Sequence, residues 1–273
     1  MSNVSDAADR VRARSIMCGD MPAFLAVPEG AASAPAVIVI HERYGLVQHI
    51  RDLARRFAAD GFVAIAPDLY FRHPDQAALH RGDAGCDISD PDAVQVLESV
   101  FDALAQEHSA DPARLAVMGI CQTARLPLVL ATSRPIGAAL VWYGAAQPRE
   151  WQVNAKYPRA LDDIIAAIDC PVLGMFGETD HLISLDDVRR LRDSLERRQK
   201  SYEIHVYRDA PHGWLNDTMP GRYRRAQAEA AWADQRVFLH AALATGRNRA
   251  QVSQRFAADV AVDYDFGRNV RYE

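Results

Sequence analysis

A cysteine between a predicted strand and a predicted helix is the residue whose setting most clearly suggests chemistry. Residues 115–118 form a short apolar run, Gly119 follows, Cys121 stands two positions later, and Thr123 comes two positions after that. Small residues at this spacing allow a tight strand-to-helix turn that projects a nucleophile above a sheet. A thiol at the start of a helix also meets the positive end of the helix dipole, which favours the thiolate. The pattern predicts that Cys121 is the nucleophile of an acyl-transfer reaction.

A carboxylate suited to the acid position of a catalytic triad follows another apolar segment. Residues 172–176 read as a strand, and Asp180 comes shortly after its end. In a triad the carboxylate fixes the tautomer of the histidine and stabilises the imidazolium. Asp180 is the favoured candidate, and Glu178, two residues nearer the strand, is the alternative.

A histidine in a restricted loop is the candidate base. His212 stands between Pro211 and Gly213, which fix a turn that would aim the ring. It would act as general base toward the thiol and as general acid toward the leaving group. Three other histidines are less well placed, because they lie in a predicted strand, next to the acid or on the last helix: His205, His181 and His240.

Glu42 follows the end of the predicted strand 36–40 and adds a second carboxylate to the candidate site. It does not begin a zinc-binding HExxH motif, because Gly45 occupies the position of the second histidine, and no other cluster has metal-ligand spacing. We therefore expect no metal. A carboxylate beside the nucleophile would perturb its protonation. The backbone N–H groups of Arg43 and Gln122 are the expected donors of an oxyanion hole.

Strand and helix patterns alternate along the chain. Strands are expected at 36–40, 62–66, 115–118, 138–142, 172–176 and 202–207, and helices at 50–60, 90–104, 126–131, 184–199 and 222–243. Apolar strands separated by helices predict a doubly wound α/β fold, with a mostly parallel sheet and helices on both faces. Ligands of such sheets bind at the carboxyl ends of strands, which is where the candidate catalytic residues fall.

The length of 273 residues fits a single α/β domain over residues 1–243, followed by a polar segment, 244–273. About 28 residues separate Tyr143 from Pro171, so we expect no large lid and a small substrate. The segment 244–273 is expected to be irregular. It would pack on the body of the protein or on a partner subunit, in which case the protein would be a homo-oligomer, or it would be partly mobile.

Composition argues against several classes of partner. The net charge is −5, and the arginine-rich runs are interspersed with acids, so we expect solvated helix faces and neither nucleic-acid nor membrane-surface binding. No segment reaches the roughly 18 apolar residues of a membrane span. Residues 1–14 are polar and show no signal peptide. Four cysteines are too few for a disulfide framework, so a reducing cytoplasm is the expected location.

An ordered set of motifs resembles the dienelactone hydrolase family, a branch of the α/β-hydrolase fold. The matching pieces, spread from about residue 22 to 243, are His41-Glu42, Ala66-Pro67-Asp68-Leu69-Tyr70, Gly119-Ile120-Cys121, Trp142-Tyr143-Gly144, the segment 177–180 and Pro211-His212-Gly213-Trp214. The resemblance implies a triad of Cys121, Asp180 and His212. It also implies that Glu42 contacts the resting thiol and moves when substrate enters. Members act on lactones and small esters without a cofactor.

The sequence departs from the family pattern at two places. Thr123 and Ala124 stand where the elbow usually has two glycines, so the turn must adjust. Dienelactone hydrolase also holds its substrate carboxylate with an arginine four residues after the histidine, and Asn216 occupies that position here. Arg72 or Arg81 would then bind an anionic group. The other candidate substrate-binding residues are Tyr143, Trp214 and Asn216.

The leading interpretation is a cofactor-free cysteine hydrolase of a small lactone or carboxylic ester, acting through a thioester acyl-enzyme. One alternative is a non-catalytic or weakly catalytic binding protein with an α/β-hydrolase fold. Another is an acyltransferase or thioesterase that uses the same triad.

Overall fold

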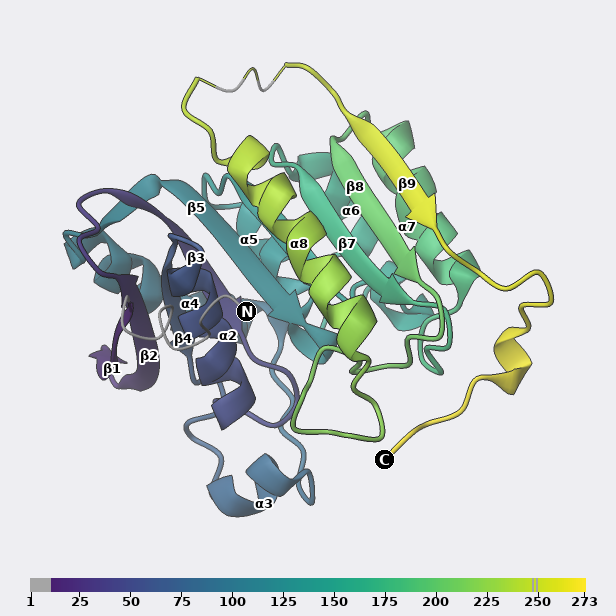
Figure 1. The fold of residues 1–273 in the computed structure, drawn as a ribbon, viewed down its shortest axis with the longest axis horizontal. Helices are drawn as coiled ribbons and strands as arrows, with labels where there is room; N and C mark the ends of the chain where they lie inside the picture. The colour runs from purple at the N-terminus through teal and green to yellow at the C-terminus, as the bar shows by residue number, and fades with distance from the viewer. Residues whose placement is uncertain (1–10, 247, 249) are drawn as a thin grey trace, which may run out of the picture. The chain divides into compact units, whose positions relative to one another are not determined.

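The computed structural model describes residues 11–246, 248 and 250–273. The chain divides into two compact units, residues 1–118 and 119–273, and each contains β-strands and helices (Figure 1). The sequence predicts no signal peptide in residues 1–14. Of these, residues 1–10 lie outside the described part of the chain.

The strands of the first unit are ordered β1-β2-β4-β3. Their bounds are Val11–Cys18 for β1, Met21–Pro28 for β2, Ala34–Ile40 for β3 and Val63–Pro67 for β4. β1 and β2 form an antiparallel hairpin, β2 pairs antiparallel with β4, and β4 pairs parallel with β3. The hairpin turns at Gly19, whose φ of 60° a glycine adopts at little cost. β5 (Ala110–Ile120) begins in this unit, and its last two residues belong to the second.

The helices of the first unit are α2 (Gln48–Ala59), α3 (Gln76–Arg81) and α4 (Asp90–Gln106). α2 packs on β2 and β4. It buries an apolar face at helical spacing, as predicted: Ile50, Leu53, Ala54 and Phe57. α4 begins where the sequence indicated, with Pro91 in the first turn and the Ser89 side chain accepting a hydrogen bond from the Asp92 N–H.

The strands of the second unit are ordered β6-β7-β8-β9, and neighbouring strands are parallel. Their bounds are Ala138–Trp142 for β6, Val172–Gly177 for β7, Tyr202–Tyr207 for β8 and Gln254–Ala258 for β9. Every residue of β6 and β7 is buried. Burial on both faces explains why these strands read as continuous apolar runs.

The helices of the second unit are α5 (Leu126–Ala131), α6 (Leu161–Ala167), α7 (Leu185–Arg197) and α8 (Arg225–Ala242). Single 3₁₀ turns are η1 (Cys121–Thr123), η2 (Pro148–Trp151) and η3 (Phe266–Arg268). Figure 1 shows α8 on one face of β7 and β8 and α6 and α7 on the other. α7 begins with the predicted capping box, in which Ser184 and Asp187 bond each other's backbone N–H groups.

The fold is therefore of the α/β class, with mostly parallel strands, as the sequence predicts. Several elements were not predicted from the sequence: β1, β2, α3, α6 and β9. β1 is largely exposed and contains little of the apolar run that marks a buried strand. β9 corrects the expectation that the segment 244–273 is irregular throughout. Its polar residues gave no strand signal, yet it extends the sheet beside β8.

Candidate active site

Cys121 stands at a strained turn directly after β5. It is the first residue of η1, and its φ is 58°, a left-handed conformation that costs a non-glycine residue about 1–3 kcal/mol. Close packing around this turn demands glycine at two positions, 119 and 144. A Cβ on Gly119 would lie 2.4 Å from the carbonyl oxygen of Thr123, and one on Gly144 would lie 2.2 Å from that of Cys121.

Thr123 fits the turn because its hydroxyl takes part in it. The hydroxyl accepts from the N–H of Ile120 (3.1 Å) and donates to the carbonyl of the same residue (3.0 Å). The predicted helix at 126–131 is α5, which spans Leu126–Ala131. Ala124 and Arg125, which link η1 to α5, also have helical backbone angles. The help expected from a helix dipole at Cys121 stays a prediction.

The three predicted triad residues meet within the second unit. The Nε2 atom of His212 lies 3.1 Å from Sγ of Cys121, and its Nδ1–H donates to Oδ2 of Asp180 at 2.8 Å. The other carboxylate oxygen of Asp180 accepts the N–H groups of Leu182 (2.7 Å) and Ile183 (3.2 Å). The acid, the base and the thiol thus form one hydrogen-bonded chain.

The alternative acid and bases have other partners. The Glu178 carboxylate accepts the backbone N–H groups of Asp209 (2.9 Å) and Ala261. His205 bonds to Glu203 at 2.7 Å, and the ring of His181 contacts His212 edge-on at 5.8 Å. The geometry therefore favours Asp180 and His212.

Two opposing effects set the charge of His212. Burial by itself would lower its pKa, but the charge of Asp180, the charge of a Cys121 thiolate and hydrogen bonds to both outweigh it, and the pKa is raised well above 6.5. The neighbouring His181 behaves differently, because burial lowers its pKa. The arrangement thus stabilises an imidazolium at residue 212, as proton transfer from the thiol requires.

The model of the dienelactone hydrolase family matches residues 21–243. This chain belongs to the dienelactone hydrolase family. Family membership makes it a hydrolase of the carboxylic ester and lactone class, and the segment after residue 243 lies outside the matched region.

Individual relatives agree with the family match. A Salmonella typhimurium protein named "Putative carboxymethylenebutenolidase" is 36% identical over 220 residues, which cover 78% of this chain and 80% of that protein. A Bradyrhizobium protein named "Probable 2-oxo-3-(5-oxofuran-2-ylidene)propanoate lactonase" is 27% identical, covering 80% of this chain and 88% of its own length. A crystal structure described as "Putative Dienelactone Hydrolase" from Klebsiella pneumoniae is 30% identical with a TM-score of 0.74, over 84% of this chain and 98% of that one.

Aromatic side chains surround the base of this dienelactone hydrolase family member. The ring of Tyr143 meets His212 edge-on at 5.3 Å, and Trp214 lies 6.2 Å from Tyr143 and 5.3 Å from Trp142. Tyr143 and Trp214 are fully buried. Both were predicted to bind substrate, and that role stays a prediction. In the structure, the packing of Tyr143 against His212 fixes the plane of the imidazole.

Asn216, which replaces the family's arginine, stabilises the loop after His212. Its side-chain oxygen accepts from the N–H (3.0 Å) and the hydroxyl (2.6 Å) of Thr218, and its own N–H donates to Gly213. The side chain is 1% exposed. Its predicted contact with substrate remains untested.

Arg125 has a role that the sequence did not indicate. This buried side chain lies four residues after Cys121 and donates to the carbonyl oxygens of Glu150 (3.1 Å) and Arg159 (2.5 Å), while its guanidinium stacks on Tyr157. It fastens the loop after β6 to the start of α5. An arginine on its own carries no sequence signal for such a role, because its acceptors are backbone carbonyls.

The predicted site residues of the first unit, Glu42 and Arg43, follow the end of β3. Glu42 is buried directly after β3, and the Arg43 side chain donates to the carbonyl of Gly82 (3.3 Å). His41, another role missed from the sequence, donates from Nδ1 to the carbonyl of Glu42 (2.8 Å) and accepts at Nε2 from the Leu69 N–H (2.9 Å). Burial lowers the pKa of His41. A neutral imidazole therefore ties the end of β3 to the segment after β4.

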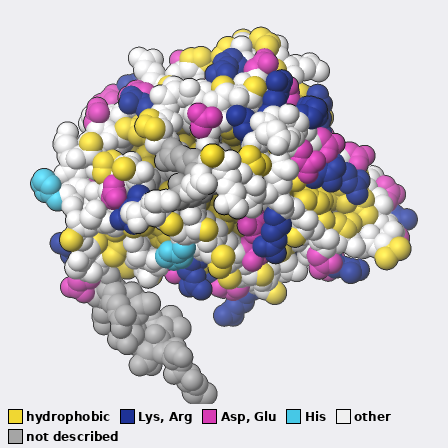
Figure 2. Space-filling view, turned by 90° about the horizontal axis from the view of Figure 1, so that it is seen from above, with side chains coloured by type: hydrophobic (Ala, Val, Ile, Leu, Met, Phe, Trp, Pro, Cys, Tyr) yellow, Lys and Arg dark blue, Asp and Glu magenta, His cyan; other side chains and the backbone are white. Residues whose placement is uncertain are grey.

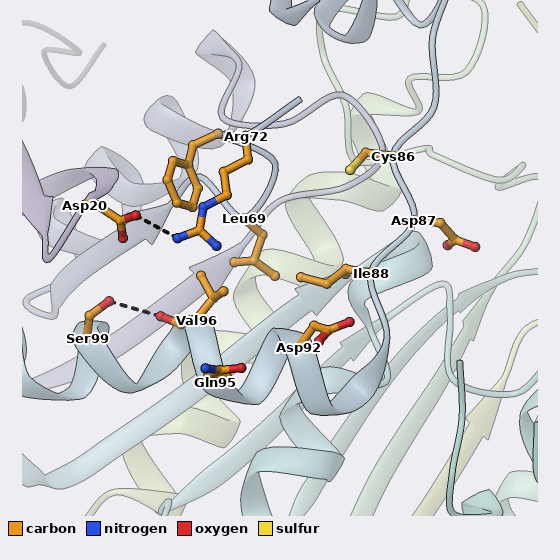
Figure 3. A pocket seen from close by; sticks show the side chains of 11 residues that line it. Asp20, Leu69, Arg72, Cys86, Asp87, Ile88, Asp92, Gln95, Val96 and Ser99 are labelled. Carbon is orange, nitrogen blue, oxygen red and sulfur yellow. Dashed lines mark hydrogen bonds and ion pairs between the residues drawn. The ribbon is translucent and has the colours of Figure 1, made fainter. Parts of the chain in front are cut away.

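The two arginines expected to bind an anionic group both pair with carboxylates. Arg72 donates to Asp20 at 2.7 Å, and Arg81 donates to Asp83 at 2.8 Å, with all four side chains exposed. Figure 3 shows Arg72 and Asp20 at the edge of a cavity of about 410 Å³ in the first unit, which Cys86 also lines. Exposed ion pairs of this kind are weak, so either arginine could exchange its partner for a ligand. Their predicted role stays a prediction.

Other surface features were also predicted from composition. The arginine-rich run 189–198 lies on α7 and pairs with acids, as expected: Arg189 with Asp186, Arg192 with Asp193, and Arg197 and Arg198 with Asp162. On the face drawn in Figure 2, basic and acidic side chains are interspersed.

Among the described residues, no group of three or more His, Cys, Asp or Glu side chains is arranged to hold a metal ion. Within the same residues, no helix is both long and apolar enough to cross a membrane.

Proposed function

We propose that this dienelactone hydrolase family member is a cysteine hydrolase of a small lactone or carboxylic ester, working through a thioester acyl-enzyme and without a cofactor. The observation that carries the proposal is the chain of contacts from Sγ of Cys121 through His212 to Asp180, at 3.1 Å and 2.8 Å. A nucleophile, a base and an orienting acid at hydrogen-bond distance are what covalent acyl transfer needs.

In the acylation step, Sγ of Cys121 attacks the carbonyl carbon while Nε2 of His212 takes the thiol proton. The carbonyl electron pair moves onto oxygen, where the backbone N–H of Gln122 and the predicted second donor, the N–H of Arg43, would stabilise it. When the carbonyl re-forms, the C–O bond to the leaving alkoxide breaks and His212 returns the proton to that oxygen. With a lactone, the new hydroxyl remains attached to the acyl chain.

In the deacylation step, water resolves the thioester. His212 takes a proton from the water, the hydroxide oxygen attacks the thioester carbonyl, and collapse expels the Cys121 thiolate. The thiolate recovers the proton from the imidazolium. One water is consumed, and the products are a carboxylic acid and an alcohol, which form one hydroxy acid when the substrate is a lactone. No redox step or cofactor enters this balance.

Relatives support the substrate class. The Bradyrhizobium protein is named as a lactonase. The short connection between β6 and β7 favours a small substrate, as the sequence suggests. Asn216 already bonds to Thr218 within its own loop, so we propose that an anionic group of the substrate binds elsewhere. The proposal keeps the gating role that the family resemblance implies for Glu42. Cytoplasmic location and a homo-oligomeric state stay predictions.

The test compares the wild-type protein with Cys121→Ala on p-nitrophenyl acetate and on a panel of small lactones. We expect turnover only in the wild type. Rapid acid quenching followed by peptide mass spectrometry should find the acyl group on Cys121. Turnover by the variant, or an acyl group on another residue, would contradict the proposal. Transfer of the acyl group to an added alcohol or thiol in preference to water would indicate an acyltransferase, and binding without turnover a binding protein.

A further inference from the structure

The segment after β9 crosses the loop that carries the catalytic acid. The side-chain Nδ2 of Asn269 donates to the backbone carbonyl of Asp180 at 2.9 Å and to that of Glu178 at 3.1 Å. Figure 1 shows this segment leaving β9 and passing through η3. One amide group thus joins the two carbonyls on either side of Thr179, at the turn that aims the Asp180 carboxylate.

The backbone of the turn from Gly177 to Asp180 has only a long hydrogen bond of its own among the contacts of the described residues. Its internal contact, from the N–H of Asp180 to the carbonyl of Gly177, is 3.4 Å long, beyond the usual 2.7–3.2 Å range. The N–H of Thr179 instead donates to the carbonyl of Ala210, which lies two residues before His212 (3.0 Å). The N–H groups of Leu182 and Ile183 hold the Asp180 carboxylate from within the loop, and groups from outside the loop also hold the backbone of the turn.

Further contacts link the same segment to the loops of the acid and the base. The Glu178 carboxylate accepts the N–H of Ala261 from the segment and the N–H of Asp209 from the loop before His212. The Tyr264 hydroxyl accepts the N–H of Leu185, the first residue of α7 (3.1 Å).

Near residue 273 the segment also meets the loop after the base. The side chain of Arg222 donates to the carbonyl of Tyr272 (2.6 Å). Gly221 lies so close to the segment that an added Cβ would stand 1.7 Å from the carbonyl oxygen of Glu273. The segment therefore contacts both loops whose relative placement sets the bond between Asp180 and His212.

We propose that residues 259–273 form a strap that holds the acid loop against the base loop, and that Asn269 is its positioning residue. The proposal rests on the triad assigned under the proposed function. The strap lies outside residues 21–243, the region that the family model matches. Asn269 acts through Asp180 and touches neither the thiol nor the base. Its effect is therefore on the geometry of proton transfer and not on substrate binding.

The test uses three substitutions at residue 269 and one control. Asn269→Ala removes the amide. Asn269→Asp keeps its shape but places a carboxylate against two carbonyl oxygens, and Asn269→Gln restores the donor on a longer side chain. Val270→Ala is the matched control, because Val270 is the neighbouring residue and its side chain is exposed. Thermal unfolding establishes that each variant is folded.

We expect Asn269→Ala to lower kcat by about tenfold, because small displacements remote from the chemistry slow it by factors up to about 10². KM should stay within about twofold. Asn269→Asp should be at least as impaired, Asn269→Gln should recover part of the rate, and Val270→Ala should match the wild type. The pKa of His212, followed by NMR of its ring, should fall in the Ala variant because Asp180 raises it less from a looser position.

Unchanged kcat in both Asn269→Ala and Asn269→Asp, together with an unchanged His212 pKa in Asn269→Ala, would overturn the strap. An equal loss in all four variants, including Val270→Ala, would also overturn it, since it would show a general dependence on this segment. The NMR readout does not require turnover. Failure of the triad assignment, seen as activity in Cys121→Ala, is therefore distinguishable from failure of the strap.

Discussion

The Nδ1 atom of His212 lies 2.8 Å from Oδ2 of Asp180, and the two side chains are 6% and 1% exposed. A charge-assisted hydrogen bond in such a dry setting is stronger than a neutral one in water. Because burial alone would lower the pKa of His212, the direction of its shift depends on this partner.

Asp180→Asn should therefore lower kcat by about 10³–10⁴-fold, because the amide neither fixes the productive tautomer nor stabilises the imidazolium. The pKa of His212 should fall, since the charge and hydrogen bond of Asp180 no longer oppose the effect of burial. NMR titration of the histidine ring and steady-state kinetics measure the two effects. A His212 pKa that stays high in the variant would show that Asp180 is not its controlling partner.

The same substitution should reduce the pH dependence of stability that His212 contributes. In the wild type the folded pKa is raised, so the stabilisation is fully present below about pH 6.5 and is lost as the pH rises through the folded pKa. In Asp180→Asn the folded pKa is lower than in the wild type, so less of this stabilisation is present and less is lost as the pH rises. Urea unfolding at a series of pH values, compared between the two proteins, tests this reduction.

Cys121→Ala and Cys121→Gly should both abolish turnover but differ in stability. Both remove the sulfur, and only glycine removes the Cβ that makes a φ of 58° unfavourable. We expect the free energy of unfolding of the glycine variant to exceed that of the alanine variant by about 1 kcal/mol, offset in part by the greater freedom of glycine in the unfolded chain. Denaturant unfolding measures the difference. Equal or lower stability of the glycine variant would show that the turn stores no strain.

His212→Ala should reduce kcat by about 10²–10⁴-fold, because the thiol loses its base and the leaving group loses its acid. His205→Ala and His181→Ala serve as matched controls and should have far smaller effects, since neither side chain contacts the thiol in the described geometry. A larger loss in either control than in His212→Ala would overturn the assignment of the base.

Glu42→Gln should make the resting thiol more reactive. If Glu42 contacts Cys121 in the resting enzyme, its negative charge disfavours a thiolate, and neutralising it should speed the labelling of Cys121 by iodoacetamide. Cys86 is half-buried and is best replaced by serine in the background, whereas burial raises the pKa of Cys18 to about 11 and should keep that thiol slow. Labelling that is already fast at low pH in the wild type, and is unchanged in Glu42→Gln, would exclude the gating role.

The three side chains that form the hydrogen-bonded chain at the candidate site could be picked out from the sequence, because local chemistry marks their positions. A tight turn after a strand requires small residues around Cys121, and Pro211 and Gly213 restrict the loop of His212. The central strands were equally readable, since β6 and β7 are buried on both faces and must be apolar along their whole length. Helix starts followed from capping residues such as Ser184.

Other features depend on partners that are remote in the chain, and these only the tertiary structure decided. β9 is polar, and it is a strand because it pairs with the edge of β8. Arg72 pairs with the carboxylate of Asp20, which lies 52 residues before it in the chain. Asn269 lies 89 residues from Asp180, and its contact is with a backbone carbonyl that any residue at position 180 would present. Side-chain type and local spacing carry the chemistry of a site, but a hydrogen bond to a distant backbone group leaves no pattern in the sequence, because every residue has the same carbonyl.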